Sequence, residues 1–234
     1  MKLLLCTMAS AIVMLLGAMA TENTTAESVR ASKDVTLQAD PLSAFWLAAI
    51  PINAEKDTHG KVVPGHKTVI LSRWTKNNLY FLFICPYEEL NLKPNPTTKS
   101  ETNQLWNWDV AEVFIGTDFE NINRYKEFEV SPQGEWIDLD IDLSKPHHED
   151  GWVWNSGFQS MARIDQTNKT WYAAICIPFS AIDTRKPASG STFRINFFRS
   201  QGPSTNRKNI AWQPTMAQTF HVPSRFGLLK LGTR

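Results

Sequence analysis

Short apolar stretches separated by turn residues run along most of the chain, and no segment keeps helical spacing of its apolar residues beyond a few positions. Runs of this length bounded by Gly, Pro, Asn and Asp are typical of strands. The pattern predicts one helical turn over Pro178–Asp183 and strands at Thr68–Trp74, Leu79–Cys85, Asp109–Gly116, Tyr125–Ser131, Glu135–Leu143, Gly157–Ile164, Thr170–Ile177, Thr192–Arg199 and Phe226–Leu231. Many short strands with regularly spaced turns predict an all-β, single-domain fold, an antiparallel β-sandwich of the jelly-roll type.

Two of these strands are apolar on both faces. In Leu79–Cys85 and Thr170–Ile177, apolar residues fill both sets of alternate positions. Because successive side chains of a strand point to opposite faces, we expect these two strands to lie centrally, with the second face also covered. The long polar segment Pro86–Gln104 is expected to form a binding loop or a mobile loop.

The first twenty residues differ in kind from the rest. Lys2 is their one charged residue, an apolar run over Leu3–Leu16 follows, and Ala18-Met19-Ala20 forms an A-x-A cleavage site. This pattern predicts a secretory signal peptide over residues 1–20, because the apolar run is short for a bilayer span. We therefore expect a secreted protein, periplasmic or extracellular, with no membrane attachment after cleavage. An uncleaved N-terminal anchor is the alternative.

Residues 21–33 are small and polar, and we expect them to form a disordered leader to a domain over residues 34–234. The chain has 24 basic and 23 acidic residues, and cleavage removes one basic residue, so the mature protein is formally neutral. A neutral chain without a basic stripe is not expected to bind nucleic acid or anionic lipid. Cys85 and Cys176 remain after cleavage; one disulfide and two buried free thiols both stay open.

Tryptophan is abundant, with nine residues in the chain. Six of them stand beside polar or turn residues rather than inside apolar runs: Trp106, Trp108, Trp136, Trp152, Trp154 and Trp212. Indole side chains in such settings often form a binding surface.

The segment around Trp106 carries the most specific chemistry. In strand geometry Val110, Glu112 and Phe114 share one face, which places a carboxylate between two apolar neighbours. Such a carboxylate needs a partner, because burying an unpaired charge is costly. A ligand hydroxyl or a buried arginine would both supply one.

An ordered set of short motifs resembles the family-9 carbohydrate-binding modules and their stand-alone relatives, over Val35–Leu231. The set comprises W-x-x-D-x-x-E-x-F-I from Trp106 to Ile115, Phe128–Pro132 after Tyr125, Trp171–Pro178, Phe193–Arg199, Ala211-Trp212 and the closing Phe226–Leu231. The resemblance implies a non-catalytic secreted protein that recognises sugar ends or oligosaccharides. It also implies a role in the catabolism of polysaccharides such as xylan. An oligosaccharide or polysaccharide is then the ligand, and a glycoside hydrolase a possible partner.

The resemblance also implies site residues. Trp106 and Trp212 match the two tryptophans that clamp a terminal sugar ring, while Glu112 and Asn196 match its polar contacts. The chain departs from the family pattern at Glu129, where the typical module has an arginine. Either Arg199 or Arg194 would then compensate for a second carboxylate near Glu112.

Three further readings remain open. Asp138, Asp140 and Asp142 share one strand face and form either a solvated face or a calcium site; the family includes calcium-binding members, so a structural calcium is the one cofactor considered. The same aspartates, together with Glu112, Glu127 and Glu129, could supply the two acids of a glycoside hydrolase. A haem-binding electron-transfer domain of the related DOMON type is another alternative, for which Met161, Met216 and His221 are available as ligands.

The adjacent pair His147-His148 is expected to lie in a solvated loop rather than to bind a metal ion.

Overall fold

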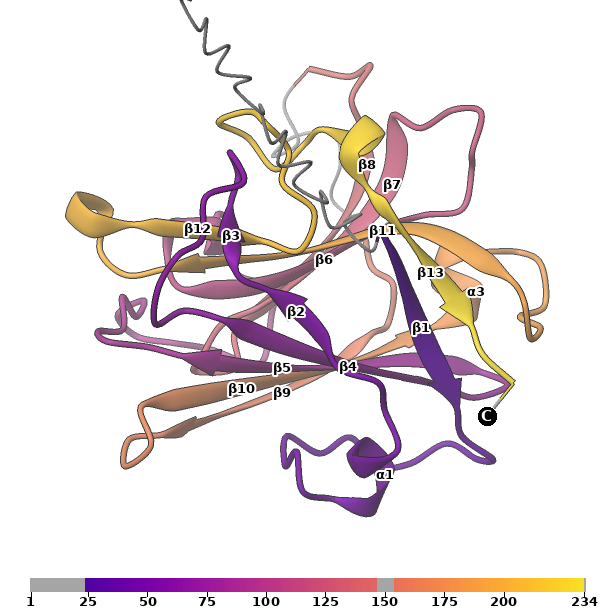
Figure 1. Ribbon diagram of the computed structural model, residues 1–234, viewed down its shortest axis with the longest axis horizontal. Coiled ribbons are helices and arrows are strands. Elements are labelled where there is room, and N and C mark those ends of the chain that lie inside the picture. Colours follow the sequence, from indigo (N-terminus) through magenta and orange to yellow (C-terminus); the bar gives the residue numbers. More distant parts are fainter. Residues whose placement is uncertain (1–23, 147–153, 234) are drawn as a thin grey trace, which may run out of the picture.

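The computed structural model describes residues 24–146 and 154–233, which fold into one all-β domain of two stacked sheets (Figure 1). Sheet A has the strand order β8-β7-β6-β11-β13, with β12 beside β11 and β3 beside β12; sheet B has the order β4-β5-β10-β9, with β2 beside β4. The strands are β1 (Thr25–Arg30), β2 (Ile52–Ala54), β3 (Lys56–Asp57), β4 (Thr68–Trp74), β5 (Asn78–Pro86), β6 (Val110–Gly116), β7 (Arg124–Val130), β8 (Trp136–Asp142), β9 (Gln159–Asp165), β10 (Thr170–Pro178), β11 (Thr192–Gln201), β12 (Lys208–Ala211) and β13 (Gly227–Leu231).

The helical elements are short. They are α1 (Ala44–Leu47), α3 (Phe179–Ile182) and the 3-10 turns η1 (Leu105–Asn107), η2 (Ser204–Asn206) and η3 (Pro223–Arg225). Each predicted strand and the predicted helical turn therefore have a counterpart, and the expectation of a single all-β domain is confirmed. In the described ranges no helix is long and apolar enough to cross a membrane.

Strand β1 joins the two sheets into one nearly closed mixed sheet. Its first residues pair with β13, starting with Thr25 opposite Leu228, and its last residues pair with β4, starting with Val29 opposite Arg73. Both pairings are parallel, whereas the pairings of the other named strands are antiparallel. The expected disordered leader is thus wrong for Thr25–Arg30. The backbone of this polar segment is ordered because it pairs along the edges of both sheets.

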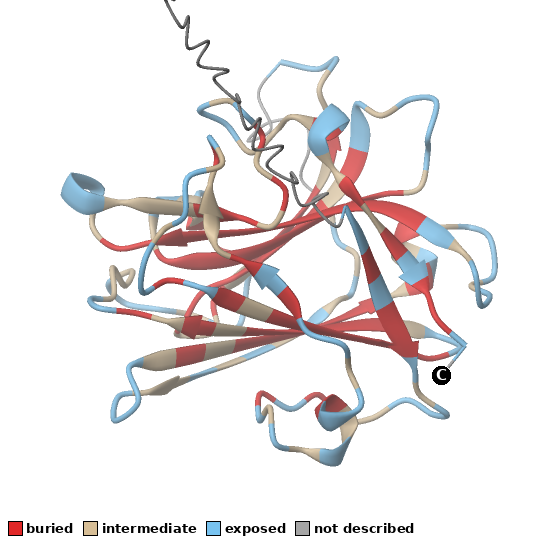
Figure 2. Ribbon diagram, viewed as in Figure 1, coloured by how far each residue is buried: buried red, intermediate tan, exposed pale blue. Residues whose placement is uncertain are grey.

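The main core lies between the sheets. Phe81 and Phe83 of sheet B meet Phe197 of sheet A edge to face, with ring centroids 5.3 and 6.0 Å apart. Figure 2 shows the buried positions concentrated along the central strands of both sheets. The outer face of β5 and β10 is covered too, because Leu82 and its neighbours pack beneath Trp46 of α1. The central placement expected for these two strands is confirmed.

A second apolar cluster covers the outer face of sheet A. Phe114, Tyr125 and Phe198 alternate there with polar residues of the same strands, and the segment after β12 folds over them with Phe220 and Phe226. This covered outer face, rather than the interior of the sandwich, holds the polar cluster described below.

The two cysteines lie on opposite faces of sheet B. Cys85 belongs to the core between the sheets, and Cys176 to the cluster under α1. Both are buried free thiols, which settles the alternative left open by the sequence.

Candidate functional site

A pocket of about 270 Å³ opens on the outer face of sheet A, and we call it the acidic pocket. Strand register explains its floor: Glu112 of β6 lies opposite Glu129 of β7, and on the other side opposite Phe198 of β11. Because residues two apart share a face, Glu127 lies on the same side. The pocket is lined by Trp106, Glu112, Glu127, Glu129, Ser200, Arg207, Asn209, Gln218, Thr219, Phe220 and His221.

Three carboxylates gather at the base of the acidic pocket. The exposed fractions of Glu112, Glu127 and Glu129 are 2, 3 and 0%. One carboxylate oxygen from each lies within 4.8 Å of the other two. Apart from the contact between the carboxyl groups of Glu127 and Glu129, both oxygens of Glu129 lack a hydrogen-bond partner, as do Oε1 of Glu112 and Oε2 of Glu127. Buried acceptors without donors are costly and rare, so this arrangement calls for a ligand, a cation or a proton.

Burial raises the pKa of all three groups, and repulsion between neighbouring carboxylates adds to this for Glu112 and Glu129. Burial raises the pKa of Glu127 to about 7. The pKa of Glu112 lies well above its usual range because of burial and the charge of Glu127, and that of Glu129 because of burial and both neighbours. Carboxyl groups in such surroundings bind a proton or a cation far more readily than exposed ones do.

Arg207 provides the nearby positive charge, but its N–H groups donate hydrogen bonds to backbone carbonyls rather than to the three carboxylates. Its guanidinium donates to the carbonyl oxygens of Gly202, Trp106 and Trp108 at 3.0, 2.7 and 2.5 Å. It also lies 3.8 Å from Oδ1 of Asp109. Arg207 lowers the pKa of Glu112 and Glu129 only as a smaller influence than burial. Its direct contacts fix the turn that carries Trp106.

Aromatic side chains line the rest of the acidic pocket. Trp106 follows Gln104, a non-glycine residue with φ of 57° that turns the chain into η1. Phe220 stacks on Phe198 with ring centroids 4.2 Å apart, and the hydroxyl of Tyr125 lies 2.6 Å from Nδ1 of His221. The pocket therefore combines aromatic faces with carboxylate oxygens, the two groups that sugar C–H faces and hydroxyls contact.

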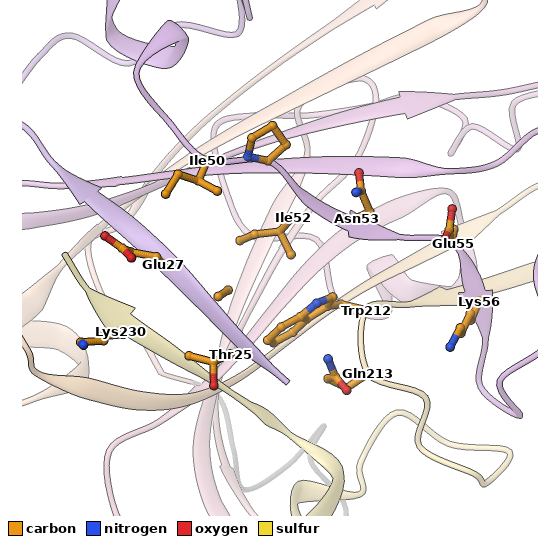
Figure 3. Close-up of a pocket in the computed structure, with 12 residues that line it drawn as sticks. Thr25, Glu27, Ile50, Ile52, Asn53, Glu55, Lys56, Trp212, Gln213 and Lys230 are labelled. Atoms are coloured by element: carbon orange, nitrogen blue, oxygen red, sulfur yellow. The ribbon is translucent and has the colours of Figure 1, made fainter. Parts of the chain in front are cut away.

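Trp212 lies on the other face of the sheet and lines a different pocket, of about 590 Å³. Figure 3 shows its indole with Ile52 of β2 and Thr25 of β1 on either side. The ring packs on Phe197 of the main core, with centroids 5.6 Å apart. It fills the space above Gly227, where an added Cβ would come within 2.6 Å of the indole. The expected clamp of Trp106 and Trp212 on one sugar therefore has to be corrected.

Two other predicted contacts do not line the acidic pocket. Asn196 is buried and bonds to the backbone of Gln213, accepting from its N–H at 3.0 Å and donating to its carbonyl at 2.8 Å. Arg199 points between the sheets, where it donates to Thr68 at 3.2 Å and to the carbonyl of Pro86 at 2.6 Å. Both side chains hold strands and loops together, so the structure gives them positions unlike those expected.

The acidic residues of β8 each have separate surroundings. Asp138 is fully buried and accepts from the backbone N–H of Ser156 at 2.5 Å, so the expected solvated face is wrong for it. Asp140 pairs with Lys126 at 2.8 Å, and Asp142 lies 3.7 Å from Arg124. In the part of the chain that the structure describes, the carboxylates grouped closely enough for one ion are those of the acidic pocket.

The side chains considered for haem are not brought together. Met161 is exposed on β9 of sheet B and Met216 is exposed beside Gly60, whereas His221 lines the acidic pocket. Trp152 and His147-His148 lie outside the described residues, while Trp108, Trp136 and Trp154 are half-buried.

Sequence reasoning missed Arg207, Asn209 and Phe220 as pocket residues. They come from segments around β12 that have no periodic pattern, so no sequence signal places them beside β6 and β7. Glu127 is different, because its position two residues before Glu129 already puts both on one face.

Comparisons with known proteins agree with this architecture. The model of the family described as carbohydrate family 9 binding domain-like matches residues 42–234. A curated relative from Arthroderma benhamiae, named extracellular protein, is 27% identical over 172 residues, which make up 68% of this chain and 72% of the relative.

Solved structures of low sequence identity share the fold. A family 9 carbohydrate-binding module from Caldicellulosiruptor kristjanssonii in complex with cellotriose is 14% identical, with a TM-score of 0.64 over 90% of this chain and 94% of that one. The corresponding complex with glucose is 13% identical, with a TM-score of 0.63 over 89% of this chain and 96% of that one. A protein from Bacteroides uniformis is 12% identical, with a TM-score of 0.69 over 88% of this chain and 98% of that one.

Proposed function

Because the chain belongs to the carbohydrate family 9 binding domain-like family, which is generally non-catalytic, we propose that it is an exported protein that binds the end of a sugar chain in the acidic pocket. The observation that carries this proposal is the meeting of Trp106 with buried carboxylate oxygens that lack hydrogen-bond donors. A sugar presents an apolar C–H face and several hydroxyl donors, and it would satisfy both groups at once.

The ligand lies with one ring face on Trp106, and Phe220 borders the same space. Hydroxyls at the ring edge donate to oxygens of Glu112 and Glu129, while Ser200 and Asn209 contribute neutral polar contacts. A volume of about 270 Å³ lies at the small end of ligand pockets, which favours a chain end over a long polymer stretch. Trp212 has no part in this site because it faces the core side of the sheet.

Related proteins narrow the ligands worth testing. The family 9 modules with this fold are in complex with cellotriose and with glucose. The predicted signal peptide and the name of the extracellular relative support export. We infer that the protein serves polysaccharide catabolism outside the cytoplasm, with cellulose and xylan fragments as candidate ligands and a glycoside hydrolase as its functional partner.

Calorimetric titration of the mature protein with glucose, cellotriose and xylotriose tests the proposal. Trp106→Ala should weaken binding strongly, whereas Trp136→Ala is the matched control. Trp136 is also half-buried, but it packs on Phe158 and lines no part of the acidic pocket. Equal loss of affinity in both variants, or none in Trp106→Ala, would place the sugar elsewhere.

An assay for released reducing ends tests the non-catalytic assignment. Incubation with each bound oligosaccharide should leave the ligand intact. Hydrolysis by the wild type that Glu112→Gln abolishes would instead support the alternative of a glycoside hydrolase.

A further inference from the structure

When ionised, the three carboxyl groups of the acidic pocket carry more negative charge than the guanidinium of Arg207 neutralises. Glu129 has no exposed surface, lines the pocket, and accepts a hydrogen bond at neither oxygen. The guanidinium of Arg207 is engaged by three backbone carbonyls and by Asp109. A site with buried, unpaired carboxylate oxygens around an open space is complementary to a cation.

The spacing of the oxygens fits a single calcium ion. Calcium binds oxygen ligands at about 2.3–2.6 Å, so two ligands on opposite sides of one ion lie at most about 5 Å apart. One oxygen from each of Glu112, Glu127 and Glu129 lies within 4.8 Å of the others. These separations are close to those of oxygens that share one calcium ion, so small side-chain adjustments suffice to bring all three into contact with it.

The chemistry of the donors favours a hard cation. The clustered ligands are carboxylates alone, with no thiol or imidazole among them, which suits calcium rather than zinc or copper. Ser200 and Asn209 line the same pocket, and the hydroxyl of Ser200 lies 3.3 Å from Oδ1 of Asn209. Calcium takes six to eight oxygen ligands in flexible geometry, so neutral oxygens and water could complete its shell.

We propose that Glu112, Glu127 and Glu129 hold a calcium ion at the base of the acidic pocket, and that its open coordination positions receive sugar hydroxyls. The ion site follows from the carboxylate cluster alone. The second half rests on the proposed sugar-binding function, so the two are tested separately.

Ion binding is measured first and without sugar. The mature protein is stripped with a chelator, then titrated with calcium chloride by calorimetry and melted with and without the ion. We expect one ion per chain and a rise in Tm of about 5 °C or more at a hundredfold excess over Kd. Glu129→Gln should lower calcium affinity at least about tenfold, because it removes one charged ligand.

Asp138→Asn is the control, since it neutralises a buried acid of the β8 run outside the cluster. It should leave calcium affinity unchanged. Glu129→Gln is nearly isosteric and removes repulsion, so its melt in chelator should show a folded protein at least as stable as the wild type. Absence of calcium binding up to millimolar concentration, or equal stabilisation of Glu129→Gln and the wild type, overturns the ion site.

Sugar binding is then measured with calcium and with chelator. We expect the chelator to weaken the affinity for the tightest-binding oligosaccharide at least about tenfold and added calcium to restore it, because sugar hydroxyls coordinate the ion. Unchanged sugar affinity in chelator overturns that half and leaves the proposed function intact. Loss of sugar binding in both conditions, with calcium still bound, overturns the proposed function and leaves the ion site intact.

Discussion

Trp106 and Trp212 should give opposite results when each is replaced by alanine, because they lie on opposite faces of sheet A. Trp212 packs on Phe197 and covers Gly227. An indole buries about 150–250 Å² when it packs into a core, and most of Trp212 is out of water. At about 25 cal/mol per Å² and roughly 130 Å², Trp212→Ala should cost about 3 kcal/mol of unfolding free energy.

The affinity for sugar should nevertheless be unchanged in folded Trp212→Ala, because this side chain does not line the acidic pocket. Trp106→Ala should lower sugar affinity by about 2 kcal/mol or more, roughly thirtyfold, as central binding tryptophans do. It should also lose some stability, because Trp106 packs against the outer apolar cluster. Affinity, rather than stability, therefore separates the two residues.

The assay combines urea unfolding with calorimetric titration at a temperature well below both melting transitions. Each variant is titrated only under conditions where its unfolding curve shows a fully native baseline. Normal binding by Trp106→Ala together with lost binding by folded Trp212→Ala would refute the reasoning. The sugar would then lie in the larger pocket of Figure 3.

Burial and the neighbouring Asp138 raise the pKa of Glu101 from 4.5 to about 7. Because the folded state then holds the proton more tightly than the unfolded state, the unfolding free energy of the wild type falls as pH rises through that interval. Urea unfolding should show Glu101→Gln gaining stability relative to the wild type between pH 5 and 8; an equal difference at both values contradicts this. Cys85 and Cys176 should react with a thiol reagent only after denaturation, and a reductant should leave Tm unchanged. Mass spectrometry of the exported protein should find Thr21 at the N-terminus, and retention of residues 1–20 would contradict cleavage.

The order and position of most strands could be predicted from the sequence, because alternation of apolar residues is a local property. Leu79–Cys85 is apolar on both faces, and the structure covers it on both sides. The shared face of Glu112 with its apolar neighbours followed from the same period of two. Strand register then put Glu129 opposite Glu112, which no single segment could show.

Other features depended on contacts between distant segments. Thr25–Arg30 has a polar sequence, yet it forms β1 because two sheet edges supply hydrogen bonds to its backbone. Trp212 has polar neighbours like Trp106, but it continues the pairing of β12 with β11 and so turns toward Phe197. Arg207 reaches the turn that carries Trp106 across about a hundred residues of chain.

The sequence by itself determined most of the longer strands and which side of each strand a residue occupies, since both follow from spacing along one segment. Only the tertiary structure decided which faces meet, and hence that Trp106 shares a pocket with three buried carboxylates while Trp212 does not. The physical reason is that face-to-face contact depends on register and on the path of the connecting loops. Those are fixed by backbone hydrogen bonds and packing between segments far apart in the chain.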